Sequence, residues 1–229
     1  MVKLNYQGHS CFIIDDGKKR IVVDPFFTGN PFTKLKPEEV IVNAILVTHA
    51  HPEHLGDAIQ IAQQNKALII GTSELINYCK SKGASFVHSM HIGGSKRFDF
   101  GDIKLTPAMH GSSSADGFAT GTPCGFLIKI GGKVIYHAGD TALFYDMRLI
   151  GEMNDIDVAL LPIGDNNTMG IKDAIKAVQF LRPNYAIPMH YDTFEVIRAD
   201  PNEFVKLVQS TRTQGVVINF GETFELPGK

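Results

Sequence analysis

Four side chains that can bind metal ions crowd into six consecutive positions. Residues 49–54 of the 229-residue chain read His-Ala-His-Pro-Glu-His. Neutral imidazole is the commonest protein ligand for transition metals, and a carboxylate beside it can bind a metal ion or carry a proton. An apolar run of strand type, 44–47, precedes this cluster and an amphipathic stretch, 55–62, follows it. The cluster therefore lies on a predicted strand-to-helix loop, where α/β proteins place their chemistry.

Three more ligand-type residues each follow a predicted strand. His110 comes after the strand-like run 103–109, and His190 comes after 186–189. Asp140 comes after the run 133–137, and the intervening Gly139 lets the backbone turn sharply. A site for two metal ions needs about six to eight ligands that converge from several strand ends. The spacing of these residues predicts such a site.

Together these residues resemble the metallo-β-lactamase-fold superfamily of metal-dependent hydrolases. That superfamily carries a His-x-His-x-Asp-His motif followed by separated His, Asp and His, and the order and rough spacing agree over most of this chain. The segments 8–12 (Gly-His-Ser-Cys-Phe) and 24–26 (Asp-Pro-Phe) resemble the branch that contains the ascorbate-6-phosphate lactonase and its small hydrolase relatives. The resemblance implies an α/β fold, a four-layer αββα sandwich of two mixed β-sheets flanked by helices.

The resemblance also implies a role for each matched residue. Two divalent ions would be bound, the first by His49, His51 and His110, the second by His54, His190 and, as a candidate, Glu53, with Asp140 bridging both. The ions would share a water molecule and lower its pKa, which gives hydroxide near neutral pH. Glu53, Asp140 and His190 are the candidate catalytic residues.

Glu53 departs from the superfamily pattern, which has Asp at this position. Glutamate reaches ~1.5 Å further, so it cannot replace Asp at typical metal–oxygen distances of ~2.0–2.2 Å unless the loop shifts. Direct binding, binding through water and a general acid–base role all remain open for Glu53. Nitrogen-rich ligands suit zinc, whereas mixed nitrogen and carboxylate ligands also suit manganese, iron or nickel. Zinc or manganese is favoured, with nickel or iron as alternatives.

Several polar residues outside the motif are candidates for contacts with the metal ligands or the substrate: His9, Asp24, Ser112, Ser113 and His137. Asp24 could orient a metal-bound histidine or begin a turn. The two serines could receive a substrate oxygen or belong to a solvated loop. His9 could equally be a hydrogen-bonded structural histidine, and for His137 a structural or ligand-supporting role is favoured.

The elements that must position these residues are short strands separated by fewer helices. Strands are predicted over 10–14, 20–23, 43–48, 67–70, 97–100, 103–107, 125–130, 133–137, 158–162, 186–189 and 216–220. Helices are predicted over 55–65, 73–81, 172–181 and 200–211. Residues 15–18 and 131–132 have the composition of hairpin turns. No linker or low-complexity tract divides the chain, which favours a single metallo-hydrolase domain over 1–229.

Composition excludes several classes of protein. The formal net charge is −2, so no bulk positive charge attracts nucleic acid or anionic membranes. The three cysteines have no CxxC spacing, and no segment has the ~20 apolar residues of a membrane helix. A cytoplasmic protein without membrane contact is expected, and a homo-oligomer is compatible with this composition.

The leading functional hypothesis is a phosphodiesterase or small nuclease. Two metal ions suit the hydrolysis of phosphodiesters in RNA or nucleotide compounds, because they can stabilise both the attacking and the leaving oxygen. The substrate would be a small molecule or a short nucleic acid, since the chain has no tryptophan and few tyrosines for stacking. The alternatives are a lactonase that acts on a sugar-phosphate-like lactone, and a non-catalytic, metal-stabilised binding protein.

Overall fold

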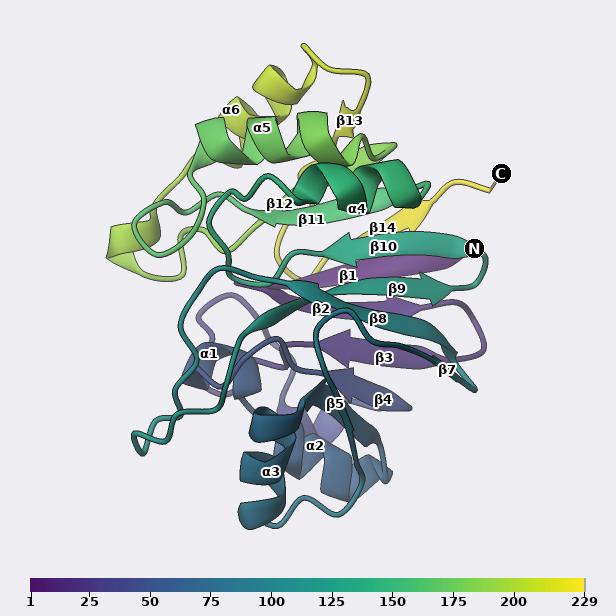
Figure 1. The fold of residues 1–229 in the computed structure, drawn as a ribbon, viewed down its shortest axis with the longest axis vertical. Helices are drawn as coiled ribbons and strands as arrows, with labels where there is room; N and C mark the ends of the chain where they lie inside the picture. The colour runs from purple at the N-terminus through teal and green to yellow at the C-terminus, as the bar shows by residue number, and fades with distance from the viewer. Residues whose placement is uncertain (229) are drawn as a thin grey trace.

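Two seven-stranded β-sheets face each other in the computed structural model, which describes residues 1–228 (Figure 1). The first sheet contains, in spatial order, β14 (Thr223–Leu226), β1 (Val2–Gly8), β2 (Cys11–Asp15), β3 (Arg20–Val23), β4 (Ala44–Leu46), β5 (Leu68–Thr72) and β6 (Val87–Met90). The second contains β13 (Gln214–Gly215), β12 (Tyr185–Met189), β11 (Val158–Pro162), β10 (Lys133–His137), β9 (Cys124–Ile130), β8 (Gly101–Pro107) and β7 (Ser95–Phe98). Each sheet is mixed, with antiparallel strands at one side and parallel strands at the other.

Helices cover the outer face of each sheet. α2 (Ala58–Asn65) and α3 (Ser73–Ser81) contact β4, β5 and β6, while α5 (Ile171–Leu181) and α6 (Pro201–Val208) contact β11, β12 and β13. The remaining helical segments are α1 (Pro52–Leu55), α4 (Met147–Met153), η1 (Pro37–Glu39) and η2 (Glu195–Ile197). Figure 1 shows α2 and α3 at one end of the stacked strands and α4, α5 and α6 at the other. This arrangement confirms the predicted αββα sandwich. None of the helices in residues 1–228 is long and apolar enough to cross a membrane.

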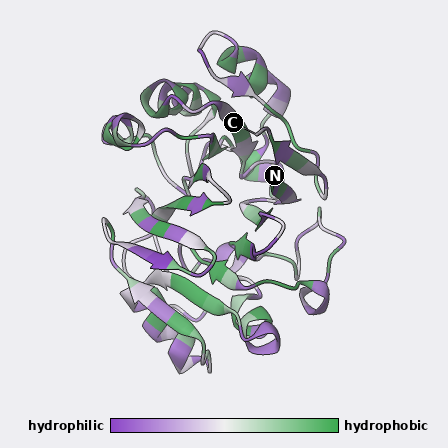
Figure 2. Ribbon diagram, turned by 90° about the vertical axis from the view of Figure 1, so that its right-hand side faces the viewer, coloured by the Kyte–Doolittle hydropathy of each residue, from purple (hydrophilic) through white to green (hydrophobic). Residues whose placement is uncertain are grey.

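The central strands are buried on both faces, which explains their continuous apolar sequences. On β3, Ile21 and Val23 belong to the core between the two sheets, whereas Val22 belongs to the core beneath α2 and α3. The helices instead carry hydrophobic and hydrophilic residues side by side (Figure 2). α2, α3, α5 and α6 therefore each bury one face against a sheet and expose the other.

The strands that precede the candidate ligands all end at the same side of the molecule. In the first sheet, β1 and β3 are both antiparallel to β2, and β4 is parallel to β3. In the second sheet, β8 and β10 are both antiparallel to β9, and β12 runs parallel to β10 through β11. The arrowheads of β3, β10 and β11 point toward the side where α1 lies (Figure 1). The loops after these strands therefore meet at one edge of the sandwich.

The helix predicted over 55–65 is divided into α1 and α2, which corrects the sequence-based prediction. Gly56 separates them with a φ of +42°, outside the helical region. A Cβ atom at Gly56 would lie 2.3 Å from the carbonyl oxygen of Pro25. The close approach of another loop therefore interrupts the helix and turns α1 toward the strand ends.

The strand predicted over 216–220 is wrong. Residues 214–215 pair with β12 in the second sheet, whereas 223–226 pair with β1 in the first. The amide of Val216 still donates to the carbonyl oxygen of Ala186 on β12, and the chain then passes from the second sheet to the first, so no continuous strand forms over 216–220. The sequence-based prediction also lacks β1, β6, β13, β14 and α4.

Candidate metal centre

Histidines and one aspartate from both sheets form overlapping groups at this edge. His49, His51 and His110 offer ligand atoms that all lie within 4.8 Å of one another. The same holds for His9, His54 and His190, and for His49, His54 and Asp140. The shared members join the groups into one cluster with two candidate metal positions.

Asp140 lies between the two histidine triads. Its Oδ2 atom is 2.9 Å from Nε2 of His190, 3.2 Å from Nε2 of His54 and 3.6 Å from Nε2 of His110. His110 belongs to one triad, and His54 and His190 belong to the other. A single carboxylate oxygen can therefore reach both candidate metal positions.

Asp24 orients the rings of His49 and His54 through hydrogen bonds on the Nδ1 side of each ring. Its Oδ2 accepts a hydrogen bond from Nδ1 of His54 at 2.7 Å and another from the hydroxyl of Thr48 at 2.7 Å. The Thr48 hydroxyl in turn lies 2.9 Å from Nδ1 of His49. With both Nδ1 atoms engaged, the Nε2 atoms of His49 and His54 face the cluster. The buried carboxylate thus fixes the tautomer and orientation of two candidate ligands at once.

Pro52 and Ser112 fix the backbone conformation of the loop that carries His49 and His51. Pro52 follows His51 and restricts it to an extended backbone, with φ −58° and ψ 146°. The hydroxyl of Ser112 accepts a hydrogen bond from the amide of Ala50 at 3.3 Å and pairs with Thr120 at 2.7 Å. Ser112 therefore supports the histidine loop, while the adjacent Ser113 is exposed.

His137 supports the turn that presents Asp140. Its Nε2–H donates to the carbonyl oxygen of Ser10 at 2.9 Å, and its Nδ1 accepts from the amide of Gly139 at 3.2 Å. Both ring nitrogens are therefore used within the protein, and His137 belongs to none of the metal-ligand groups found in residues 1–228.

Among the described residues, His9 groups with potential metal ligands and Glu53 does not. His9, expected near the ligands or the substrate, lies in the same group as His54 and His190. Glu53, expected as a candidate ligand, is half-buried and belongs to none of the groups formed by the described part of the chain. The alternating apolar residues at positions 2, 4 and 6 mark β1 as a strand that ends just before His9. That pattern is the signal that could have identified His9.

Burial keeps several of these histidines neutral. It lowers the pKa of His9 and His49 well below the usual range, with nearby histidines adding to the effect. Burial also lowers the pKa of His110. Neutral imidazole has the free electron pair that a metal ion requires.

His54 differs because two carboxylates flank it. Although burial acts to lower it, the charges of Asp140 and Asp24 raise the pKa of His54 to about 10. For Asp140, burial acts to raise the pKa, but His190 and His54 hold it well below the usual range. The site between Asp24 and Asp140 thus favours a positive charge, which a metal ion can supply.

Several buried polar atoms of the cluster have no hydrogen-bond partner, which is expected of groups that bind metal ions. Four buried side-chain atoms in the cluster make no hydrogen bond: Nε2 of His9, Nε2 of His54, Nδ1 of His190 and Oδ1 of Asp140. Buried polar groups without partners are costly. Their concentration among imidazole and carboxylate groups fits divalent transition metals.

Comparisons with known proteins agree with this site. The β-lactamase superfamily domain matches residues 3–190. UPF0173 metal-dependent hydrolases of Anoxybacillus flavithermus and Bacillus subtilis (YtkL) are 52% and 50% identical to this chain, and each alignment covers 98% of this chain and 100% of the relative. The solved structure of Igni18, a metallo hydrolase from the hyperthermophilic archaeon Ignicoccus hospitalis, is 41% identical with a TM-score of 0.89 and 99% coverage of both chains.

These similarities confirm the prediction that the chain belongs to this superfamily and is a metal-dependent hydrolase. They do not support the alternative hypothesis of a non-catalytic binding protein. The matched region contains the strand ends and the histidine–aspartate cluster described above. The chain therefore belongs to the UPF0173 metal-dependent hydrolases, with the domain of the β-lactamase superfamily.

Proposed function

We propose that this protein uses two divalent metal ions to hydrolyse phosphodiesters of the nucleotide or short-RNA type. The position of Asp140 Oδ2 between two histidine triads supports a pair of adjacent ions. Paired ions suit phosphodiesters because they can stabilise the attacking and the leaving oxygen of one displacement.

The two ions would be held by groups on opposite sides of Asp140. His49, His51 and His110 would hold one, and His54 and His190 would contribute to the other. When bound, such ions would supply Lewis acidity and lower the pKa of a water molecule. Zinc or manganese is proposed, because the donors are mostly imidazoles with one carboxylate.

The chain's own groups would orient the ligands and move a proton. Asp24 and Thr48 hold the rings of His49 and His54 so that their Nε2 atoms face the cluster. Glu53 precedes His54 on α1 and is half-buried. Among the described residues it belongs to no group of potential metal ligands. These features make Glu53 the candidate for carrying a proton to the leaving group.

Exposed side chains indicate where a nucleotide could approach. His51 and His110 are partly exposed, whereas His9, His54 and His190 are buried. On either side of His110 in the sequence, Met109 and Phe118 are each 59% exposed. Such side chains can contact a nucleobase or another flat group attached to the phosphate.

A lactonase remains the second candidate, and one observation favours it. The rings of Phe26 and Phe194 lie 5.8 Å and 5.7 Å from the ring of His9, which makes this side of the cluster apolar. An apolar wall suits an uncharged ring better than a second phosphate ester group.

A substrate panel distinguishes the two candidates. Protein loaded with zinc or manganese is assayed with bis(p-nitrophenyl) phosphate, short RNA, lactones and thioesters. Phosphodiesters are expected to be hydrolysed, and Asp140→Asn, which keeps the side-chain shape but removes the charge, is expected to lose at least about 100-fold in rate. Turnover of lactones alone would overturn the phosphodiester proposal and support the alternative. Unchanged activity in Asp140→Asn would contradict the proposed site.

A further inference from the structure

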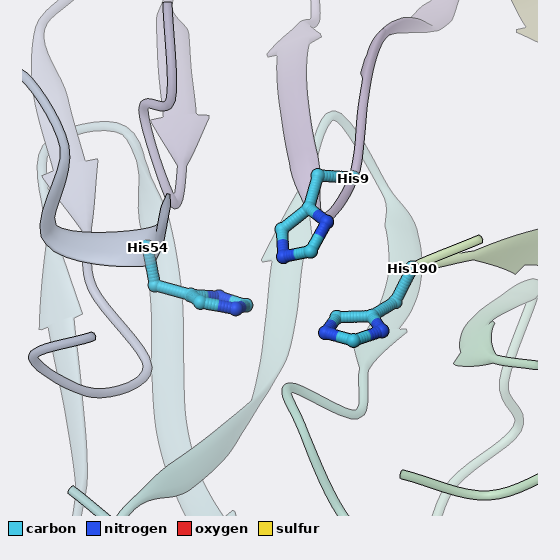
Figure 3. A group of neighbouring side chains, drawn as sticks. All are labelled: His9, His54 and His190. Atoms are coloured by element: carbon cyan, nitrogen blue, oxygen red, sulfur yellow. The ribbon is translucent and has the colours of Figure 1, made fainter. Parts of the chain in front are cut away.

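We infer that His9, and not Glu53, supplies the third protein side chain of the second metal position, together with His54 and His190. This inference rests on the proposed two-ion site and extends it to a ligand outside the matched motif. Figure 3 shows the rings of His9, His54 and His190 turned toward a common space from three separate segments of the chain.

One ring nitrogen of His9 makes a hydrogen bond, and the other has no hydrogen-bond partner. Its Nδ1 lies 3.0 Å from the hydroxyl of Thr193, which can accept the Nδ1 proton. Its Nε2 is buried and has no hydrogen-bond partner. This is how metal-binding histidines are commonly arranged, with one nitrogen fixed by a hydrogen bond and the other presented to the ion.

The distances place His9 at bonding range of a shared ion. The ligand atoms of His9, His54 and His190 all lie within 4.8 Å of one another. The His9 ring centroid is 4.2 Å from that of His190 and 5.0 Å from that of His54. Because tetrahedral zinc binds each nitrogen at about 2.0–2.1 Å, one ion can lie among the three rings after small side-chain movements.

The backbone fixes His9 against His190 across the two sheets. The amide of His190 donates to the carbonyl oxygen of His9 at 2.7 Å, and the hydroxyl of Tyr6 donates to the same oxygen at 2.9 Å. Both histidines have a φ of +55°, in the left-handed region that only a few per cent of non-glycine residues occupy, although histidine, asparagine and aspartate occur there more often than other types. Such strain tends to be retained where a side chain is needed at a functional site.

Glu53 lacks each of these features. It is half-buried, belongs to no group of potential metal ligands in residues 1–228, and no side-chain hydrogen bond orients it in the structure. Replacing a carboxylate by an imidazole changes the donor set to six histidines and one aspartate. This set favours zinc over manganese at the second position.

The test compares His9→Asn with Glu53→Gln as its matched control. Asparagine tolerates the left-handed backbone at position 9 but is too short to reach the ion. Each purified full-length protein is loaded with zinc, freed of excess metal, and measured for zinc per chain. The wild type and Glu53→Gln are expected to hold two ions. In His9→Asn the affinity for the second ion is expected to fall by about 100-fold or more, beyond the 10–100-fold typical of removing a supporting contact.

Cobalt substitution provides a readout that a purely structural role would not change. The Nδ1 proton of His9 should give a strongly shifted NMR signal beside bound Co²⁺. The signal should be absent from His9→Asn and present in Glu53→Gln. If His9→Asn misfolds by circular dichroism, Thr193→Val tests the inference instead, since it frees the His9 ring and should weaken the second ion.

The outcomes separate this inference from the proposed function. Two ions held equally well by His9→Asn, or loss of the second ion in Glu53→Gln, would overturn the role of His9. Fewer than two ions in the wild type would overturn both. Two ions that depend on His9, without hydrolysis of any phosphodiester, would support the inference and contradict the proposed function.

Discussion

His137 is held at both ring nitrogens by the backbone, and this predicts how the protein responds to acid. Its Nδ1 accepts from the amide of Gly139, so protonation there would break the bond. Burial lowers the pKa of His137 accordingly. As the pH falls below about 6.5, the unfolded chain takes up a proton at this residue before the folded chain does. The contribution to stability is therefore complete above about pH 6.5 and is lost as the pH falls toward the lower folded pKa.

The variant His137→Gln isolates this contribution. Glutamine can donate to Ser10 and accept from Gly139 but does not titrate. The free energy of unfolding is measured with urea between pH 5 and 8, with chelator present. Between pH 6.5 and 5 the free energy of unfolding should fall less steeply in the variant than in the wild type. The two slopes should differ by up to about 1.4 kcal/mol per pH unit. Parallel curves would show that His137 does not titrate in this way.

At the scale of elements, the break between α1 and α2 positions His54. Gly56→Ala would place a Cβ atom 2.3 Å from the Pro25 carbonyl oxygen, at a residue with positive φ. Gly17 is the matched control, because its φ is also positive but nothing lies within 4 Å of its Cβ position. Gly17→Ala should cost about 1 kcal/mol from backbone strain alone.

Gly56→Ala should cost more, on the order of 3 kcal/mol, because a clash with backbone is added to the strain. It should also weaken metal binding, since relief of the clash moves α1 and the ring of His54 with it. Urea unfolding and metal titration measure the two effects. Equal stability of the two alanine variants would contradict the role of Gly56.

At the scale of the whole molecule, the last strand of the chain, β14, forms an edge of the first sheet. β14 pairs with β1, and Leu226 lies opposite Val2 in the core between the sheets. Leu226→Ala should lower the free energy of unfolding by about 2–4 kcal/mol, as for other buried leucines. The adjacent Glu225 is paired with Lys3 at the surface, at 2.9 Å. Glu225→Ala should change stability by less than about 1 kcal/mol. Thermal unfolding of both variants tests this, and comparable losses would mean that β14 does not contribute to the core.

Local patterns determined most of the fold. The runs at 20–23, 133–137 and 158–162 form strands with the predicted bounds, and α3 spans the predicted 73–81. Apolar strands and amphipathic helices are encoded by neighbouring residues, so they can be recognised without tertiary contacts. The break at Gly56 could not be predicted in the same way, because its cause is a loop some thirty residues earlier in the chain.

The sequence by itself determined the two-sheet fold, the family, and a histidine–aspartate cluster at the ends of several strands. The tertiary structure decided which side chains complete that cluster. The position of His9 beside His190 depends on the contact between the β1–β2 turn and the end of β12, made by the hydrogen bond from the amide of His190 to the carbonyl oxygen of His9. Motif spacing carries no information about that contact, because it joins residues from opposite ends of the chain in two different sheets.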